Sequence, residues 1–315
     1  MLPIDFLEPF AMLESCVPMF ISSILSNEIQ QSRFSSFFDG TTKKPDPFCI
    51  TEGGETIKID AISQGNGTNR KMVAVVPLWG ALSPNGEYGG TATRDFAKTV
   101  ASLANDSQIG AIVIRVNSPG GTVVGTMEAQ KALLDVRQNS SAPIVASVDH
   151  LMASAATWLG TTASEVWMTP SGSAGSIGVI SIYSDVSQAL EKFGIKLEVM
   201  RAPAKKARFS GVEPMTEDMR ATMTTRLGEA YADFKRAMAD NRKVRIDSIE
   251  SRFGGGELLN AEESLAAGLV DKIGTFDDLV SSLLSKMKTR PPASNGQALR
   301  RAELDILEFQ FRAKN

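Results

Sequence analysis

The sequence predicts an α/β protein with a largely parallel sheet, and two observations support this. Continuous apolar segments with β-branched residues, such as residues 72–82 and 110–117, are typical of strands buried on both faces. These segments alternate with stretches of helical spacing, which is the pattern of a parallel sheet. The chain has 315 residues, of which 43% are hydrophobic and 22% charged, so it has room for one or two ordinary globular domains.

The predicted elements follow one another from residue 72 onward. The first strand spans residues 72–82, and Phe96, Val100 and Leu103 have the spacing of the first helix. Thr216 and Asn260 are expected to cap two later helices, because short polar side chains accept hydrogen bonds from the first turn. The remaining elements are strands at 110–117, 143–149, 164–170 and 177–185, a helix at 122–139, a short strand after 254, a buried edge at 269–274, a final helix to 287, and one more helix at 298–309.

The N-terminal part differs in character from the rest. Residues 5–29 indicate a short helix, and the polar stretches at 39–47 and 63–71 are typical of linkers. We therefore expect an N-terminal arm and linker over residues 1–70, a catalytic domain over 71–287, and a C-terminal linker and helix over 288–315.

Composition excludes several classes of function. The formal net charge is −3, which argues against a nucleic-acid partner or an anionic membrane surface. Cys16 and Cys49 cannot form a structural zinc site, and a single histidine makes a metal-dependent mechanism unexpected. We expect no metal and no cofactor. The apolar run at 17–25 has no basic leader and is too short to span a bilayer, so we expect a cytoplasmic chain without a membrane anchor.

Three short motifs lie where predicted strands end. "VNSPGG" (116–121) ends a strand and provides adjacent glycines, whose N–H groups can bind an oxyanion or simply form a tight turn. "MASAATW" (152–158) surrounds Ser154 with small residues, so Ser154 is either an open hydroxyl or a packing serine. "SGSAGSIGVI" (171–180) is a further glycine-rich turn, which alone indicates only a close approach of two chains.

Taken together, the motifs resemble those of peptidase family S49, which includes the signal peptide peptidases and the phage capsid-assembly proteases. The matching elements keep the family's order over residues 72–285. They are Ser118–Gly121, Ala153–Ala156, Gly175–Val179, Phe193–Lys196, Lys205–Lys206 and Ala261–Asp278. This resemblance implies a ClpP/crotonase-like fold of repeated ββα units with a helical C-terminal part.

The resemblance also implies a serine–lysine dyad. Ser154 matches the nucleophile and Lys206 the general base, with Lys205 as the adjacent alternative. A serine hydroxyl needs a base near neutral pH, and a lysine can accept a proton only when it is neutral. Because desolvation favours the neutral form, we expect Lys206 to lie in a dry pocket.

Other positions complete the implied site. Ser176 matches the serine that orients the lysine ammonium. The N–H groups of Gly120 and Gly121 match the oxyanion hole, with Gly121 as the preferred donor. His150, four residues before Ser154, invites a triad, but no carboxylate has the spacing to support it, so we interpret it as a bystander. Asn117 stands where the family commonly has an acidic residue, and this should leave the oxyanion donors intact.

The functional hypothesis is a phage prohead protease that cleaves scaffold and capsid proteins. The lack of a counterpart to the transmembrane anchor of membrane signal peptide peptidases favours this phage branch. A cellular peptidase that degrades signal or other peptides is an alternative, as is a catalytically silent capsid-assembly or scaffold-binding protein. An acyl-CoA-handling crotonase relative is disfavoured by the series from Gly175 to Lys206. The family's fold also implies a homo-oligomer, of a ring size that the sequence does not give.

Overall fold

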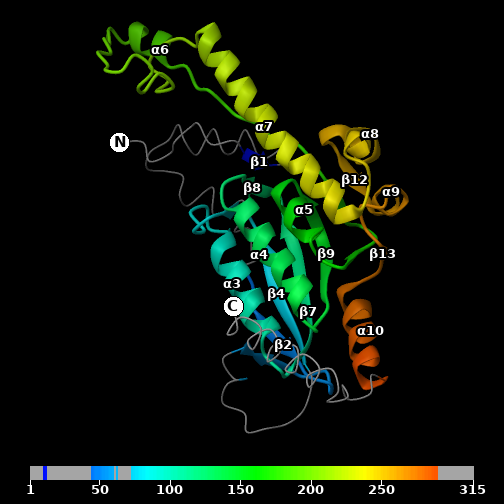
Figure 1. The fold of residues 1–315 in the computed structure, drawn as a ribbon. Helices are drawn as coiled ribbons and strands as arrows, with labels where there is room; N and C mark the ends of the chain where they lie inside the picture. Colours follow the sequence, from blue (N-terminus) through cyan, green and yellow to red (C-terminus); the bar gives the residue numbers. More distant parts are fainter. Residues whose placement is uncertain (1–9, 13–43, 60–61, 63–71, 290–315) are drawn as a thin grey trace, which may run out of the picture.

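The structure is a computed structural model, and it describes residues 10–12, 44–59, 62 and 72–289. Its main sheet runs through the centre of the molecule (Figure 1). The sheet order is β12-β11-β9-β7-β4-β2-β3, and β10 and β13 pair off this path. The bounds are β2 Phe48–Ile50, β3 Thr56–Lys58, β4 Met72–Trp79, β7 Ile109–Ser118, β9 Ile144–Ala153, β10 Glu165–Met168, β11 Ser173–Gly175, β12 Leu258–Asn260 and β13 Lys272–Ile273.

The central strands β4, β7 and β9 can run parallel because the chain returns through a helix, α3 or α4, between one strand and the next. β4 pairs with β7 and β7 pairs with β9 in parallel register. Every residue of β4 from Met72 to Leu78 is buried, which explains its continuous apolar sequence. Within the predicted arm, β2 pairs antiparallel with β4 and β3 with β2, so residues 48–58 extend the main sheet.

A small second sheet lies at the carboxyl ends of the main strands. Its order is β1-β8-β5-β6, with β1 at Phe10–Met12, β5 at Leu82–Ser83, β6 at Thr91–Ala92 and β8 at Gly120–Thr122. The predicted strand at 72–82 is therefore two strands, separated at Gly80, which has a φ of 64°. β4, β5 and helix α3 (Thr93–Ala104) form one unit, and β7, β8 and α4 (Thr126–Asn139) form the next. This arrangement confirms the α/β class and the repeated ββα units.

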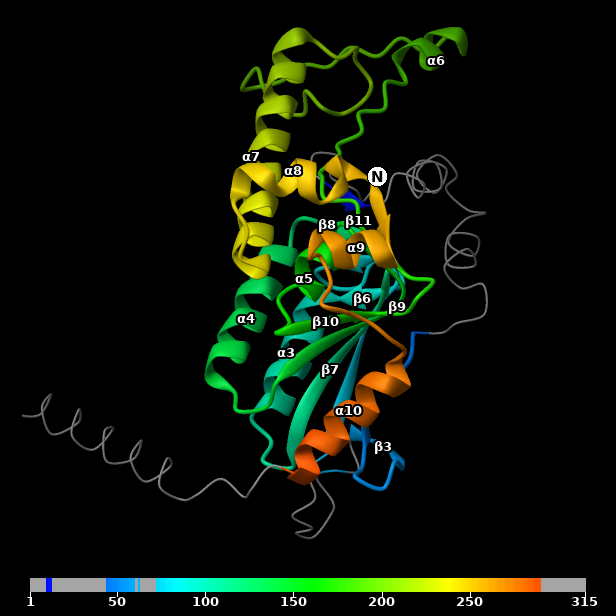
Figure 2. The ribbon, with the colours of Figure 1, turned by 90° about the vertical axis from the view of Figure 1, so that its right-hand side faces the viewer.

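Helices cover both faces of the main sheet. On one face, α3, α4 and the short α5 (Ala155–Gly160) enclose the larger hydrophobic core, whose largest buried side chain is Trp158. On the other face, Leu279, Val280 and Leu283 of α10 (Phe276–Thr289) pack against Val73, Val75, Val113 and Val145 of the sheet. Figure 2 shows α10 in front of the sheet, with α3 and α4 behind it.

The predicted helical C-terminal part is confirmed. Thr216 caps α7 (Glu217–Arg242), and Asn260 forms a capping box with Glu263 at the start of α9 (Ala261–Ala267). Phe234 of α7 stacks on Trp158 with ring centroids 4.5 Å apart, which fixes the C-terminal half of α7 to the core. Two short helices complete this half of the chain, α6 (Ser187–Lys192) and α8 (Ile249–Arg252).

The first part of α7 leaves the body of the molecule. Figures 1 and 2 both show it projecting together with α6 and the segment between them, which is residues 193–216. We call residues 187–216 the projecting segment. Large apolar side chains are exposed on it, and Phe193 and Met200 have 82% and 93% of their surface in water. Isolated chains rarely leave such side chains uncovered.

Two predicted elements are wrong. Residues 177–185 do not form a strand. The neighbouring strand β11 ends at Gly175, and both of its edges are already paired, one with β9 and one with β12. Residues 10–12, which lie inside the predicted helix at 5–29, form the strand β1. The predicted helix at 298–309 and Cys16 lie outside the described residues.

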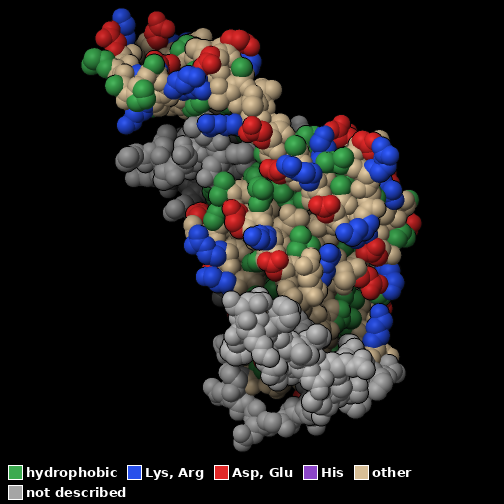
Figure 3. Space-filling model, viewed as in Figure 1, with side chains coloured by type: hydrophobic (Ala, Val, Ile, Leu, Met, Phe, Trp, Pro, Cys, Tyr) green, Lys and Arg blue, Asp and Glu red, His purple; other side chains and the backbone are tan. Residues whose placement is uncertain are grey.

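No helix in the described ranges has the length and apolar character needed to cross a membrane. Figure 3 shows acidic and basic side chains interspersed over the face it presents, with no large patch of one sign.

Candidate active site

Three predicted site residues lie together at the carboxyl ends of neighbouring parallel strands. Ser118 of β7 is level with Met152 of β9, and Met152 is level with Ala174 of β11. Two residues further along each chain segment come Gly120, Ser154 and Ser176, each just past the end of its strand. Ligand sites of parallel α/β sheets lie at this edge. The three motifs singled out in the sequence therefore meet at one place.

Ser154 stands at a sharp junction between β9 and α5. Its backbone has φ 55° and ψ −118°, a conformation that costs a residue with a side chain of order 1–3 kcal/mol. The residue is fully buried, and its Oγ has no hydrogen-bond partner in the structure. A buried hydroxyl without a partner is unfavourable for folding, so Ser154 is an exception among buried polar side chains that calls for an explanation.

The strand ends around Ser154 are held by backbone contacts. The Ser154 N–H donates to the carbonyl of Gly175 at 2.8 Å, and the Ser176 N–H donates to the carbonyl of Glu257 at 2.7 Å. Ser176 is itself buried and has a φ of 51°. The first bond places Ser154 beside Gly175, the residue before Ser176, where β9 and β11 end.

Gly120 and Gly121 begin β8, and neither position tolerates a side chain. Gly120 has a φ of 97°, which favours glycine. A Cβ at Gly121 would lie 1.8 Å from the carbonyl oxygen of Leu82, because β8 passes close to β5 there. The helix α5, which follows Ser154, packs against β8. The candidate oxyanion strand is therefore fixed against the element that carries the serine.

Ser118 and Thr157 support the site, and the sequence analysis missed both. The Ser118 hydroxyl donates to the Gly80 carbonyl at 2.6 Å and accepts the Gly120 N–H at 3.1 Å. The Thr157 hydroxyl lies 2.6 Å from the Met152 carbonyl and 2.9 Å from the Gly175 carbonyl, which ties β9 to β11. Both residues stand inside quoted motifs, but only the fold shows which carbonyl groups their hydroxyls reach.

Lys206 is not brought to Ser154 in this single chain. Lys205 and Lys206 are exposed on the projecting segment, which points away from α5 and β8 in both views (Figures 1 and 2). The expectation of a dry pocket around Lys206 is therefore not met by the described residues of the single chain, among which Lys206 is exposed.

His150 is exposed on β9 rather than on a helix. Four steps along an extended strand separate the backbone of His150 from that of Ser154 by about 13 Å, which puts the two side chains beyond hydrogen-bond reach. The adjacent Asp149 is buried and bonds to Arg115 at 2.8 Å. Burial raises the pKa of the Asp149 carboxyl, and the Arg115 guanidinium opposes that rise. Asp149 is thus engaged on the neighbouring strand, which supports the interpretation of His150 as a bystander.

No group of three or more His, Cys, Asp or Glu side chains with metal-binding geometry occurs in the part of the chain that the structure describes. Cys49 is buried in the sheet, and burial is the main cause that raises the pKa of its thiol to about 12. The Cys49 thiol is therefore not a nucleophile near neutral pH.

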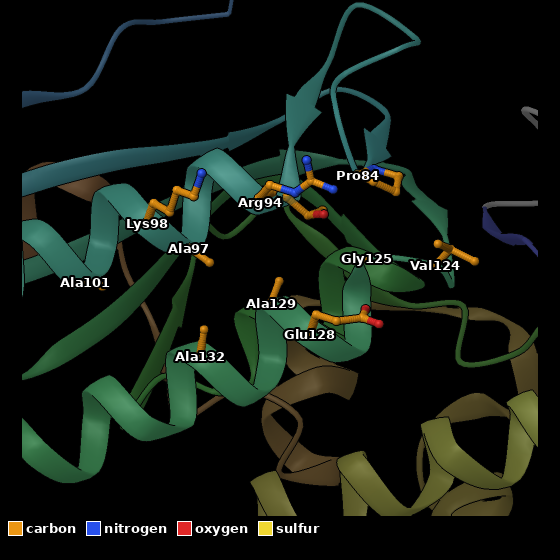
Figure 4. A pocket seen from close by; sticks show the side chains of 11 residues that line it. Pro84, Arg94, Ala97, Lys98, Ala101, Val124, Gly125, Glu128, Ala129 and Ala132 are labelled. Atoms are coloured by element: carbon orange, nitrogen blue, oxygen red, sulfur yellow. The ribbon is translucent and has the colours of Figure 1, made fainter.

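A pocket of about 430 Å³ lies between α3 and α4, beside the end of β8. Figure 4 shows small side chains of the two helices facing one another across it, among them Ala97 and Ala129, with Arg94 and Lys98 on α3. None of the predicted site residues lines this pocket. Thr93 also lines it, and the buried Thr93 hydroxyl has no hydrogen-bond partner among the residues that the structure describes.

Comparison with known proteins gives a family match. Residues 136–290 match the sequence model described as "Peptidase family S49". Protease 4 of Salmonella typhi is 30% identical over 220 residues, which cover 69% of this chain and 35% of that protein. Capsid assembly protease C of Escherichia phage lambda is 24% identical over 236 residues, or 71% of this chain and 51% of that protein. The chain thus spans about a third to a half of the length of these two relatives.

A solved structure, that of a ClpP1 mutant from Listeria monocytogenes, matches with a TM-score of 0.41 and 16% identity. The match covers 65% of this chain and 94% of that one. The family match at residues 136–290 begins before Ser154 and includes Ser176 and Lys206. The chain is thus similar to peptidase family S49 over residues 136–290, and its relatives include both cellular and phage proteases.

Proposed function

We propose that the chain is a serine endopeptidase in which Ser154 is the nucleophile and Lys206 the general base. The observation that carries this proposal is the state of Ser154, whose buried hydroxyl has no partner at a strained junction beside Gly120 and Ser176. Lys205 remains the alternative base, because both lysines are exposed on the same segment. The proposed protease domain is residues 71–287.

The reaction is an acyl transfer in two steps. The Ser154 Oγ bonds to the substrate carbonyl carbon while the Lys206 Nζ takes its proton, and the C–N bond then breaks as the lysine protonates the leaving amine. Water afterwards hydrolyses the ester on Ser154. Backbone N–H donors stabilise the oxyanion, and removing one typically costs about 2.7–4 kcal/mol. Gly121 is the preferred donor, because the Gly120 N–H already donates to Ser118. Ser176 would orient the Lys206 ammonium.

The proposed dyad requires the projecting segment to meet a Ser154, and we place that contact between two copies of the chain. The segment carries exposed Phe193, Ile195, Leu197 and Met200, and a homo-oligomer would cover them. Lys206 would then enter the dry environment that a base needs when a neighbouring copy closes over it.

The proposed role is maturation of a phage capsid, with scaffold or capsid proteins as substrates and the host cytoplasm or prohead as the setting. The similarity to capsid assembly protease C supports it. The higher identity to Protease 4 favours a second candidate, a cellular peptidase that degrades signal or other peptides.

Co-expression with a candidate scaffold or capsid protein tests the proposal. The native chain should cleave the partner at defined bonds, read by mass spectrometry, and Ser154→Ala and Lys206→Ala should not. Lys205→Ala and His150→Ala are the matched controls and should cleave at the native rate. Cleavage by Ser154→Ala at the native rate would overturn the proposal. Binding of the partner without cleavage by any variant would indicate a silent assembly protein.

A further inference from the structure

The strand β1 occupies the outer edge of the candidate oxyanion strand. Phe10, Ala11 and Met12 lie opposite Thr122, Gly121 and Gly120 in antiparallel register. The other edge of β8 pairs with β5. Without β1, the backbone groups of β8 would form an open sheet edge beside the row of Gly120 and Ser154.

An open edge of this kind binds extended peptides by adding a strand, since main-chain hydrogen bonds do not depend on the peptide's sequence. β1 runs from Thr122 toward Gly120, so its carboxyl end comes to the strand end where Ser154 stands. A peptide bound in this direction would bring its carbonyl groups past Gly121 and then Gly120. β1 therefore lies where a peptide would have to lie to reach Ser154.

From this register we propose that residues 10–12 are an internal competitor, which must leave β8 before a substrate peptide can bind. The inference rests on the proposed function, because it concerns the regulation of that same site. A three-residue strand makes few hydrogen bonds, so covalent attachment and the resulting high effective concentration keep it in place. Such a contact is reversible. The apparent affinity for peptides is then the intrinsic affinity multiplied by the fraction of open molecules, in which β1 has left β8.

Peptide binding by full-length chains that carry Ser154→Ala tests this without requiring catalysis. The probe is a fluorescently labelled synthetic peptide of residues 6–15, and the readout is anisotropy. Ala11→Pro removes an N–H and the strand conformation at the centre of β1. Ala11→Val keeps the N–H and the strand conformation, so it is the matched control. Proline should tighten probe binding by about tenfold, as expected if one molecule in ten is open, and valine should leave it unchanged.

Equal affinity of all three chains for the probe would overturn the proposal, and so would the absence of binding. Amide hydrogen exchange gives a second reading, because the amides of β8 should exchange faster in Ala11→Pro than in Ala11→Val. Equal exchange would also count against it. In chains that retain Ser154, proline should lower KM for a short peptide at unchanged kcat. If probe binding changes as expected but no chain cleaves any peptide, the proposed function fails while the competition stands.

Discussion

At the scale of single residues, the candidate site is marked by Ser154, whose conformation and burial are unfavourable for the stability of the fold. Ser154 has a positive φ and is fully buried, and its hydroxyl has no hydrogen-bond partner within the described part of the chain. The neighbouring contacts from Gly175 and Thr157 hold the chain in that conformation. Strain kept in place by its surroundings is typical of catalytic residues.

The strain predicts different effects for two substitutions of Ser154. Ser154→Gly should be more stable than Ser154→Ala by about 1 kcal/mol, because glycine accepts a positive φ and alanine does not. Denaturant unfolding measures the difference, and neither variant should cleave peptides. An alanine variant as stable as the glycine variant would show that the junction is not strained.

Asp149 predicts a pH dependence of stability. Burial raises the pKa of its carboxyl in the folded chain, so the folded state binds more protons than the unfolded state in the acid range. The contribution of Asp149 to the unfolding free energy therefore falls as pH rises from its ordinary pKa through the raised one. The stability of the native chain relative to Asp149→Asn should decrease over that range, as measured by unfolding at a series of pH values. A difference that grows with pH would contradict the assignment.

At the scale of elements, β8 links the serine to the rest of the site. It touches β1, β5 and α5, and at Gly121 it leaves no room for a Cβ. Its geometry therefore depends on its glycines, Gly121 for the close approach and Gly120 for the positive φ.

Gly121→Ala should destabilise the chain by about 1–3 kcal/mol, because the new methyl group would meet the Leu82 carbonyl. It should also abolish peptide cleavage. Gly228→Ala is the control on the exposed side of α7, where nothing lies within 4 Å, and it should raise stability by about 1 kcal/mol. Thermal unfolding distinguishes the two, and a fully stable Gly121→Ala would contradict the close approach of β5 and β8.

The elements also show how far sequence reasoning reaches. Buried parallel strands such as β4 and β7 were predictable from their continuous apolar residues, and the caps at Thr216 and Asn260 from local chemistry. The strand expected at 177–185 does not form, although its residues have the apolar pattern of a strand. The edge of β11 where it could have been added is already paired with β12. Pairing of β1 with β8 joins segments more than one hundred residues apart, and no local pattern reports that.

At the scale of the whole molecule, the proposed site is divided between the body and the projecting segment. Ser154, Gly120 and Ser176 meet through strand register, whereas Lys206 stands exposed on the projecting segment. Sequence resemblance named these residues together, but it could not show that a single chain leaves the proposed base, Lys206, exposed to solvent.

If Lys206 serves a neighbouring copy, two inactive variants should complement each other. Co-expressed Ser154→Ala and Lys206→Ala chains should form mixed oligomers with about a quarter of native activity, because one site in four then combines both intact residues. Peptide cleavage after tandem-affinity purification measures this, and each variant expressed alone is the control. Mixed oligomers without activity would mean that the lysine acts within its own chain or not at all.

The most direct test of the dyad is covalent labelling of the native chain with a fluorophosphonate, followed by peptide mapping. We expect one adduct, on Ser154, and labelling at least about a hundredfold slower in Lys206→Ala, in line with the usual contribution of a general base. Lys205→Ala should label at the native rate. An adduct on another residue, or native labelling of Lys206→Ala, would contradict a Ser154–Lys206 dyad.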